Sequence, residues 1–417
     1  MNILRQLAYQ TLLSLSTDEG INASGKEEVF GCIFGRDSAI TILKILRAHS
    51  KKPALDLLAI CRKALLNLVT LQGSEFNIES GEEPGKFIHE FRKDNYQHVI
   101  EKYGPRFIYP NGFLKNYDSI DSTPLGLITL YNYYQITDDQ EFLVTVLPHV
   151  EAGLNWIITF GDKDKDLFIE YDFPTVRKFA GSRVQSWTDS EESIMQANGK
   201  MPLYPIAPVE AQAYAWLALK LWADFYKDHS AKFAKKLSIY ARDLKKKFNE
   251  QFIIEDNGAL YAAQALDGNK NQIKTVTANS LLCLFASYKS ECILKEEFIG
   301  DFVKRAFMKD MFVEDAGIRT MSSRSETFNP NQDSYHNGSF WPMLNGLIVE
   351  GLENFGFQEE ANLLKRASIK AVEHFGCPIE VYIKTGDSYI EWRSSNGHSS
   401  CMSQAWSAAG ILDILTD

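Results

Sequence analysis

A carboxylic acid beside a tryptophan is the first feature of this sequence that points to chemistry. The stretch Gln185-Ser186-Trp187-Thr188-Asp189-Ser190 places Asp189 two residues after an indole ring. If folding buries Asp189 against Trp187, the low polarity raises the pKa of the carboxyl, as a general acid requires. The following Glu191 and Glu192 are expected to be solvated. We therefore predict that Asp189 is a general acid.

Further charged, amide and aromatic side chains gather in stretches that interrupt the helical pattern. Such mixtures are typical of sugar sites, where flat rings stack on the C–H faces of the sugar and polar groups fix its hydroxyls. The predicted substrate-binding residues are Arg36, Asp37, Asp118, Asp121, Trp187, Glu210, Gln212, His336, Trp341, Gln404 and Trp406.

Several of these acids also have an ordinary structural interpretation. Asp37 and Asp121 stand where a helix cap is expected, and Glu210 stands in the first turn of a helix, where the dipole favours a negative charge. Glu380, in the stretch Cys377-Pro378-Ile379-Glu380-Val381-Tyr382, can be a surface acid on a strand-like turn. Asp118 has no such explanation, so we expect it in the cleft.

Motifs for other chemistries are missing from the sequence. It contains no GxxxxGK[ST], GxGxxG or GxSxG pattern, and His89-Glu90 lacks the second histidine of a zinc-protease motif because position 93 is Lys. The eight histidines show no metal-ligand spacing. The sequence therefore predicts neither a metal nor a cofactor.

The composition limits the kinds of molecule that this protein is expected to bind. The 417 residues carry a net charge of −10 without a long basic run, which argues against binding to nucleic acid or to anionic membranes. No run of 18 apolar residues occurs, so no membrane span is predicted. The six cysteines are scattered without a CxxC pair, and the N-terminus lacks a signal-peptide core, so we expect a cytoplasmic protein. A neutral sugar fits this charge, and the oligomeric state is left open.

Apolar residues recur at helical spacing and predict the elements that position these side chains. Twelve helices are expected, with short and long connections alternating as in repeated helical hairpins. Six hairpins can close into an all-α (α/α)6 toroid of six inner and six outer helices, built as one domain over 1–417, with the long loops at one end. An open solenoid is the alternative. The predicted helices span 2–16, 37–49, 53–72, 122–135, 139–161, 207–227, 231–253, 275–287, 295–308, 338–355, 358–375 and 402–415.

An ordered set of short motifs resembles the amylo-α-1,6-glucosidase, or glycogen-debranching-enzyme-like, glycoside hydrolases. The set runs from Gly35 to Trp406 and reads GRD, PGKxxHExR, SxDSTPL, QxWxDS, PxAPVExQ, GIRT, YHNGSxWP, PxE and QAWSAA. The resemblance implies an (α/α)6 catalytic domain that hydrolyses an α-linked glucoside or oligosaccharide with inversion. It also implies that Asp189 is the general acid and that Glu380 is the general base. One residue separates Pro378 from Glu380, where relatives have the two adjacent.

Other functions remain open at this point. A hydrolase of the same architecture, such as an invertase, a trehalase or a glycosylglycerate hydrolase, would differ mainly on the leaving-group side of the pocket. A non-catalytic sugar-binding toroid would not need both Asp189 and Glu380. If the enzyme inverts, its two carboxyl groups should lie roughly 6.5–9.5 Å apart, leaving room for a water molecule.

Overall fold

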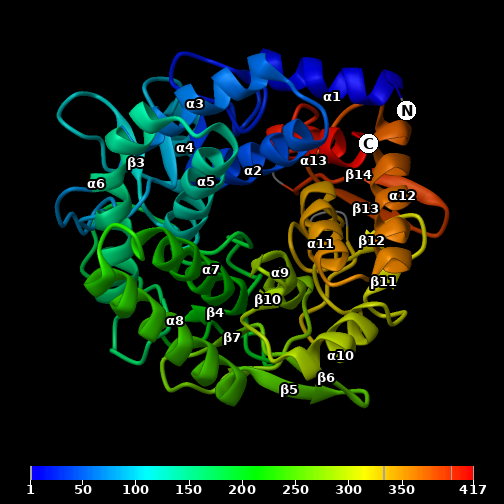
Figure 1. The fold of residues 1–417 in the computed structure, drawn as a ribbon. Coiled ribbons are helices and arrows are strands. Elements are labelled where there is room, and N and C mark those ends of the chain that lie inside the picture. Colours follow the sequence, from blue (N-terminus) through cyan, green and yellow to red (C-terminus); the bar gives the residue numbers. More distant parts are fainter. Residues whose placement is uncertain (1, 332–333, 396, 417) are drawn as a thin grey trace.

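The computed structural model describes residues 2–331, 334–395 and 397–416, and its helices form a ring around a central axis (Figure 1). Six helices line the centre. Each contacts the next along the chain, and the last contacts the first, so that the ring closes. These inner helices are α2 (Gly35–Lys51), α5 (Ser122–Thr137), α7 (Val209–Tyr226), α9 (Leu282–Phe285), α11 (Pro342–Asn354) and α13 (Ala405–Ile414).

Outer helices cover this inner ring. The N-terminal helix packs on α13, and Arg5 Nε donates to Thr416 Oγ1 (3.2 Å), so the two ends of the chain close the ring together. A further helix, α4 (Gln97–Tyr103), lies in a long loop outside the ring. The outer helices are α1 (Asn2–Leu15), α3 (Leu55–Thr70), α6 (Gln140–Trp156), which continues as the π-turn η1 (Ile157–Gly161), α8 (Ala231–Gln251), α10 (Glu296–Ala306) and α12 (Gln358–Phe375).

The difference between inner and outer helices follows from their side chains. Almost every residue of α7 is buried, as expected for a helix that is apolar on all sides. In α8, buried residues recur every three or four positions, from Ala234 through Leu237, Ala241 and Leu244 to Phe248. This pattern leaves a charged face toward solvent.

One inner helix is much shorter than the sequence predicted. Instead of a helix over 275–287, the chain forms the 3-10 turn η2 (Ala278–Leu281) followed by the four residues of α9. The polar side chains of this segment bind elsewhere: Ser280 Oγ donates to the Ala262 carbonyl (3.1 Å), and Asn279 Oδ1 accepts from Trp187 Nε1 (3.0 Å). Lys289 and Ser290, both with positive φ, then turn the chain into a hairpin.

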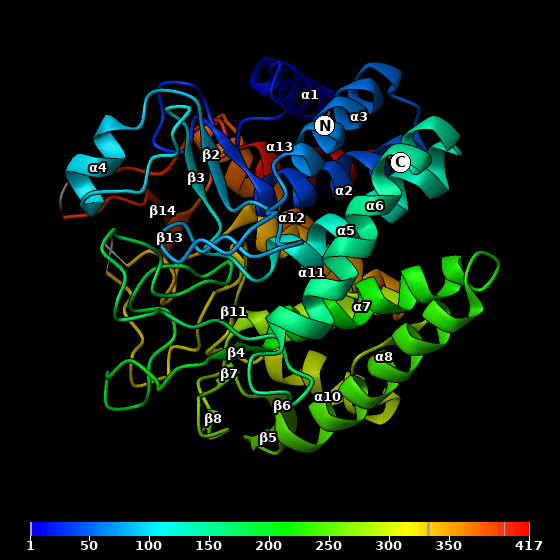
Figure 2. The ribbon, with the colours of Figure 1, turned by 90° about the vertical axis from the view of Figure 1, so that its left-hand side faces the viewer.

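The long loops hold short antiparallel sheets that the all-α prediction did not include. Most of them lie at one side of the ring, together with α4, while helix ends lie at the other (Figure 2). One three-stranded sheet consists of β1 (Ile33–Phe34), β2 (Glu90–Arg92) and β3 (Leu114–Asn116). Another consists of β4 (Ala207–Pro208), β7 (Ala265–Leu266) and β8 (Gln272–Ile273). The hairpins are β5 (Ile253–Asp256) with β6 (Ala259–Ala262), β9 (Ser287–Tyr288) with β10 (Glu291–Cys292), β11 (Phe312–Val313) with β12 (Gly317–Ile318), and β13 (Tyr382–Thr385) with β14 (Ser388–Glu391).

One helical segment has the length and composition of a membrane span. It runs from Gln140 to Gly161, and 44% of its most apolar window is buried inside the structure. A single helix of this kind is weak evidence for a membrane segment, since the core helix of a folded domain passes the same test. Its α6 part packs on α3 and α5 within the ring.

Candidate active site

The N-terminus of α2 places two charged residues at the loop end of the ring. The amide of Gly35 donates to the carbonyl of His89 (2.9 Å). A Cβ at Gly35 would lie 2.0 Å from the carbonyl oxygen of Ile88, so only glycine permits this approach of the two chains. Arg36 and Asp37 are thereby held, buried, in the first turn of the helix.

Arg36 connects two acids of different exposure. Its Nη1 donates to both carboxylate oxygens of Asp121 (3.1 Å each), and its Nη2 donates to Oδ2 of Asp189 (2.8 Å). Asp121 is fully buried, whereas 31% of the Asp189 side chain is exposed. Burial by the surrounding protein raises the pKa of Asp189, and the charge of Arg36 opposes this increase. Asp189 therefore combines a raised pKa with access to the pocket.

Glu380 is almost completely buried, and each carboxylate oxygen has one donor. The Tyr335 hydroxyl donates to Oε1, and the backbone amide of Cys401 donates to Oε2 (3.0 Å). Burial raises the pKa of Glu380 to about 7, although the donors from Cys401 and Tyr335 act against it. The Glu380 amide also donates to the Cys401 carbonyl (2.9 Å), which fixes the position of the acid on its loop.

Asp37 is a third acid in the same place. Burial raises its pKa to about 7; Arg36 lowers it, while the charges of Asp189 and Glu380 add to the increase. The charges of both other acids thus disfavour ionisation of Asp37. Such electrostatic coupling is a feature of sites that hold and move protons.

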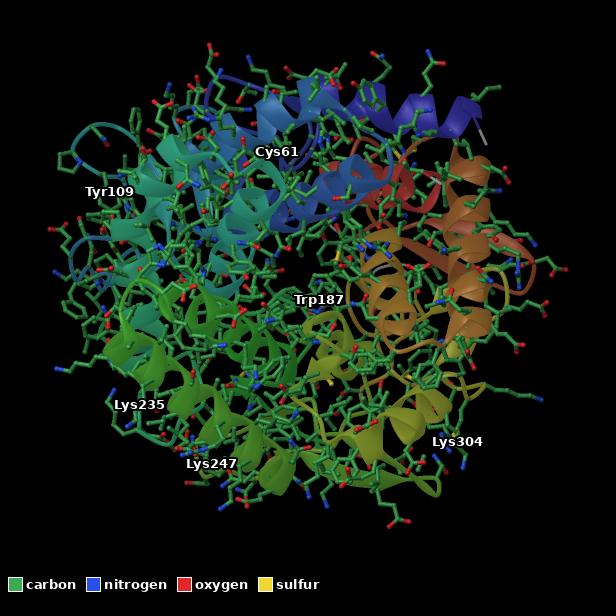
Figure 3. The ribbon with its side chains drawn as sticks, in the orientation of Figure 1. Cys61, Tyr109, Trp187, Lys235, Lys247 and Lys304 are labelled. Atoms are coloured by element: carbon green, nitrogen blue, oxygen red, sulfur yellow. The ribbon has the colours of Figure 1, made fainter. Side chains whose placement is uncertain are left out.

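Aromatic rings form the wall beside these acids. Trp187, which lies near the centre of the ring in Figure 3, meets Trp341 edge to face (centroids 5.6 Å apart). His336 stacks on Trp341 (5.1 Å, planes within 8°), and Trp406 meets Trp341 from another side (6.1 Å). His336 Nδ1 lies 2.7 Å from the hydroxyl of Ser190, next to Asp189. Burial lowers the pKa of His336, so this ring is neutral.

These side chains line a cavity that is partly open to solvent. It brings together most of the residues predicted from the sequence, from loops far apart in the chain. Its lining consists of Phe30, Phe34, Arg36, Asp37, Trp187, Asp189, Tyr335, His336, Trp341, Glu380, Gln404 and Trp406.

Gln404 connects the wall to the first loop. The orientation of its amide that satisfies both neighbours has the nitrogen donating to the Ala23 carbonyl (2.8 Å) and the oxygen accepting from Trp406 Nε1 (3.2 Å). It therefore connects the ring of Trp406 to the loop that precedes α2.

Two predicted residues near α5 lie outside the lining. Asp118 is buried against Arg177, whose Nη1 donates to both carboxylate oxygens (3.0 and 2.9 Å), and it faces a different cavity. Asp121 lies behind Arg36 and accepts from the Ser119 hydroxyl (2.5 Å). Its side chain does not cap α5, and that of Asp37 does not cap α2. The structure gives Asp121 the role of positioning Arg36.

Two predicted residues in the first turn of α7 are also away from the lining. Glu210 is fully buried, which raises the pKa of its carboxyl to about 8. Gln212 accepts from the Ile169 amide (2.9 Å) and donates to the carbonyls of Ile169 (2.8 Å) and Pro208 (3.0 Å). Gln212 therefore anchors the long loop that carries Asp189.

The sequence-based prediction missed Tyr335, Phe30 and Phe34. Tyr335 directly precedes His336 in the YHNGSxWP motif, so its place beside a predicted site residue was a usable signal. Phe30 and Phe34 lie before α2 in a segment whose pattern gave no reason to single them out. Their rings meet edge to face (5.7 Å) at the edge of the cavity.

A second cavity adjoins the first and shares Phe30, Tyr335 and Glu380 with it. Lys102 of α4 and His398 of the loop after β14 line it together with Glu192 and Glu380, and neither basic group forms an ion pair with a described carboxylate. Burial lowers the pKa of Lys102 to about 8. The indole Nε1 of Trp392, which also lines this cavity, has no acceptor among the described residues.

A group of three acids that could hold a metal ion lies elsewhere in the described part of the chain. Asp162, Asp164 and Asp166, in the loop after η1, hold carboxylate oxygens within 4.8 Å of one another. None of the three lines either cavity. In the first cavity, Asp189 is paired with Arg36, and Glu380 with Tyr335.

Comparison with known proteins finds the same fold in a sugar-cleaving enzyme. The GH63 mannosylglycerate hydrolase of Thermus thermophilus in complex with glucose has a TM-score of 0.68 and 14% identity, covering 98% of this chain and 99% of that one. Its complex with Tris and D-glycerate has a TM-score of 0.66 at the same identity and coverage. No curated protein sequence matches the chain. The model of the family described as amylo-alpha-1,6-glucosidase matches residues 69–413, which are most of the sequence. The chain therefore belongs to the amylo-alpha-1,6-glucosidase family of glycoside hydrolases.

Proposed function

We propose that this chain is an exo-acting, inverting α-glycosidase with an (α/α)6 catalytic domain, in which Asp189 is the general acid and Glu380 the general base. The observation that carries the proposal is the convergence of these two carboxyl groups, from loops about 190 residues apart, on one cavity walled by tryptophans. Inverting hydrolysis requires two such groups.

The reaction assigns one step to each acid. Asp189 donates its proton to the glycosidic oxygen as the bond between this oxygen and the anomeric carbon breaks. Glu380 takes a proton from a water molecule, whose oxygen bonds to the anomeric carbon from the opposite face. The products are the free alcohol and a sugar of inverted configuration. Asp189 ends ionised and Glu380 protonated, and transfer of one proton between them through solvent restores the starting state.

The surroundings of each acid support these roles. Burial favours protonated Asp189, and a bound sugar that excludes water from the cavity strengthens this effect. Tyr335 and the Cys401 amide donate to Glu380 and thereby favour its ionised form, as a base requires. Arg36 and Asp37, beside Trp406, are in place to bind sugar hydroxyls.

A hydrolase of glycosides with an acidic leaving group is the second candidate. Two features favour it: Lys102 and His398 face the adjoining cavity without a described ion-pair partner, and Tyr103 lines the same cavity near the general acid, since burial and then the charge of Asp189 raise the pKa of Tyr103. The fold neighbour is a mannosylglycerate hydrolase, and it covers nearly the same length as this chain. A carboxylate on the leaving group would compensate the charge of Lys102 and accept a hydrogen bond from His398.

Hydrolysis of a substrate panel, followed by NMR of the first-formed anomer, tests both candidates. The panel should contain isomaltose and longer α-1,6- and α-1,4-glucosides, trehalose, sucrose, and the pair glucosylglycerol and glucosylglycerate. The proposal expects release of the β-anomer from an α-linked substrate. Initial release of the α-anomer would replace inversion by a retaining mechanism. A protein that binds these sugars but hydrolyses none of them would be the non-catalytic toroid.

The pair with and without a carboxylate separates the two candidates. If the leaving group is acidic, glucosylglycerate is cleaved in preference to glucosylglycerol, and Lys102→Gln removes the preference. Lys93→Gln is the matched control, because Lys93 is exposed and paired with Glu19 outside the cavity. Equal rates on both glycosides would leave the neutral-sugar candidate in place.

A further inference from the structure

A segment after η1 has the spacing of a calcium-binding loop but holds a lysine ammonium at its centre. The sequence Asp162-Lys163-Asp164-Lys165-Asp166 places carboxylates at every second position. In the EF-hand loop, positions 1, 3 and 5 supply such side chains, and position 6 is a glycine that makes the sharp turn. Here position 6 is Leu167, which adopts the same left-handed conformation (φ 85°) without being glycine.

The rest of the pattern is partly kept. Position 9 is Glu170, whose carboxylate contacts the ammonium of Lys270, as do the carboxylates of Asp164 and Asp166. Position 12, where an EF-hand carries a bidentate glutamate, is Phe173. The loop therefore retains a ring of carboxylates and lacks the ligand that completes a calcium shell.

Lys270, from the turn between β7 and β8, occupies the centre of this ring. Its Nζ lies 2.7 Å from Asp164 Oδ2 and 3.1 Å from Asp166 Oδ2, and it donates to Glu170 Oε1. One ammonium thus contacts three carboxylates that a divalent cation would bridge.

One carboxylate oxygen of this ring of acids has no partner among the described residues. Glu170 has no exposed side-chain surface, and its Oε2 has no partner among the described residues. Besides Lys270, the described cation that contacts these carboxylates is Lys247, at 3.3 Å from Asp166 Oδ2. An ammonium offers three donors in a small sphere, fewer than the six to eight contacts of calcium, so an acid left without a partner is the expected result of such a replacement.

The backbone of the loop is already ordered as a binding loop requires. Asp162 Oδ1 accepts from the Asp166 amide (2.8 Å), and its Oδ2 accepts from the Leu167 amide (3.1 Å) and from the Tyr240 hydroxyl (3.0 Å). These bonds hold the turn independently of Lys270. Removal of the ammonium would therefore leave the carboxylates in place.

We infer that the segment Asp162–Glu170 is a cation-binding loop whose cation is the ammonium of Lys270, and that removal of this ammonium opens the loop to a divalent cation such as Ca²⁺. The inference does not depend on the proposed function. It also explains a charged cluster on a part of the molecule that contributes nothing to the lining of the sugar pocket.

The test compares the natural chain with Lys270→Asn. Asparagine tolerates the positive φ of position 270 (62°) and supplies an oxygen ligand. Terbium luminescence excited through Tyr240 reports occupancy of the loop, and the thermal midpoint in CaCl2 and in EDTA reports stability. We expect Lys270→Asn to bind terbium with a Kd of roughly 10⁻⁴–10⁻³ M, as in weak oxygen-ligand sites, and calcium to raise its midpoint. The natural chain should show neither effect.

Matched variants make the result specific. Lys163→Asn lies in the same loop but removes an ion pair with Glu83 (3.1 Å), so it should remain insensitive to calcium. Asp164→Asn combined with Lys270→Asn should lose the terbium signal. A Lys270→Asn protein that ignores calcium, or that stays equally unfolded in calcium and in EDTA, contradicts the inference. Calcium stabilisation of the natural chain would contradict it as well, because Lys270 would then not be the resident cation.

Discussion

The charged groups at the two ends of helix α2 differ in their surroundings: those at one end line a cavity, and those at the other form ion pairs. At its N-terminus, Arg36 and Asp37 belong to a cavity in which burial raises the pKa values of Asp37, Asp189 and Glu380. At its C-terminus, Lys44, Arg47 and Lys51 face acids of α11 and α13. The same helix therefore joins a region of acids with raised pKa values to a region of matched ion pairs.

The pairing at the C-terminal end is close to complete. Asp413 receives Arg47 at 2.7 Å and Lys51 at 3.0 Å, and Glu350 receives Lys44 at 2.6 Å. Although burial opposes it, these cations lower the pKa of Asp413. Positive groups at a helix C-terminus also agree with the helix dipole. This end stabilises the closure of the ring between α2, α11 and α13.

The comparison teaches where the fold can tolerate unsatisfied charge. Buried acids with full ion pairs hold inner helices together, whereas Asp37 and Glu380, which form no described ion pair, line the cavity. An acid without an ion pair can hold or release a proton more readily. The substitutions below separate the two kinds, from the largest expected effect to the smallest.

Asp189→Asn and Glu380→Gln should each lower kcat by about 10²–10⁴-fold on the best substrate, because each removes one proton-transfer group. Initial-rate measurements check this, and circular dichroism should show an unchanged fold. Gln212→Ala, which disturbs the anchor of the loop that carries Asp189, is the control. It should change the free energy of unfolding more than it changes the pH dependence of kcat. Near-native turnover by either acid variant would remove that residue from its assigned role.

Asp413→Ala should destabilise the protein by about 3–5 kcal/mol, because it removes a buried acid that Lys44, Arg47 and Lys51 share and leaves Lys51 without an acid. Urea unfolding measures this loss, and kcat per folded molecule should remain unchanged. Asp243→Ala breaks an exposed pair with Arg242 and should leave the urea midpoint almost unchanged. Equal losses in the two variants would contradict the interpretation of the C-terminal network.

Glu380→Gln should stabilise the protein at pH 8 by about 2–3 kcal/mol. The folded pKa of Glu380, about 7, lies above the unfolded value. Stability is therefore lost as pH rises through this interval, since the folded state resists ionisation. Glutamine cannot ionise, so its advantage should vanish below about pH 4. A stability difference independent of pH would speak against this account.

Tyr335→Phe should lower kcat/KM by about tenfold and move its acidic limb to higher pH. The Tyr335 hydroxyl donates to Glu380 and holds its pKa down; without it, the base needs a higher pH to ionise. The pH profile distinguishes this from simple loss of packing. Tyr389→Phe, whose hydroxyl binds the Asp315 carbonyl (2.8 Å), should leave the limb in place.

The helices were predictable because their pattern is local. Apolar spacing alone indicated α1, α3, α8 and α12 within a few residues of their observed bounds. It failed at α9, where Asn279 and Ser280 bind distant partners and the helix stops after one turn. The short strands were missed because pairings of two to four residues leave little periodic signal.

The sequence predicted many of the residues that line the cavity, but it did not predict how the predicted residues are arranged. Residue types and motif order indicated Arg36, Trp187 and Trp341, which do line the cavity. They equally indicated Asp118 and Glu210, which are buried in other surroundings. An acid that binds a sugar and an acid that binds an arginine look alike in the sequence, because their difference lies in the partner.

The sequence by itself determined the helical pattern, the acidic and aromatic composition of the loops, and the family to which the motifs belong. Only the tertiary structure decided which acids share a cavity, that Tyr335 binds Glu380, and that Lys270 fills the ring of Asp164, Asp166 and Glu170. The physical reason is range. Helix formation depends on residues three and four positions apart, whereas burial, ion pairing and the resulting pKa values depend on groups brought together by closure of the ring.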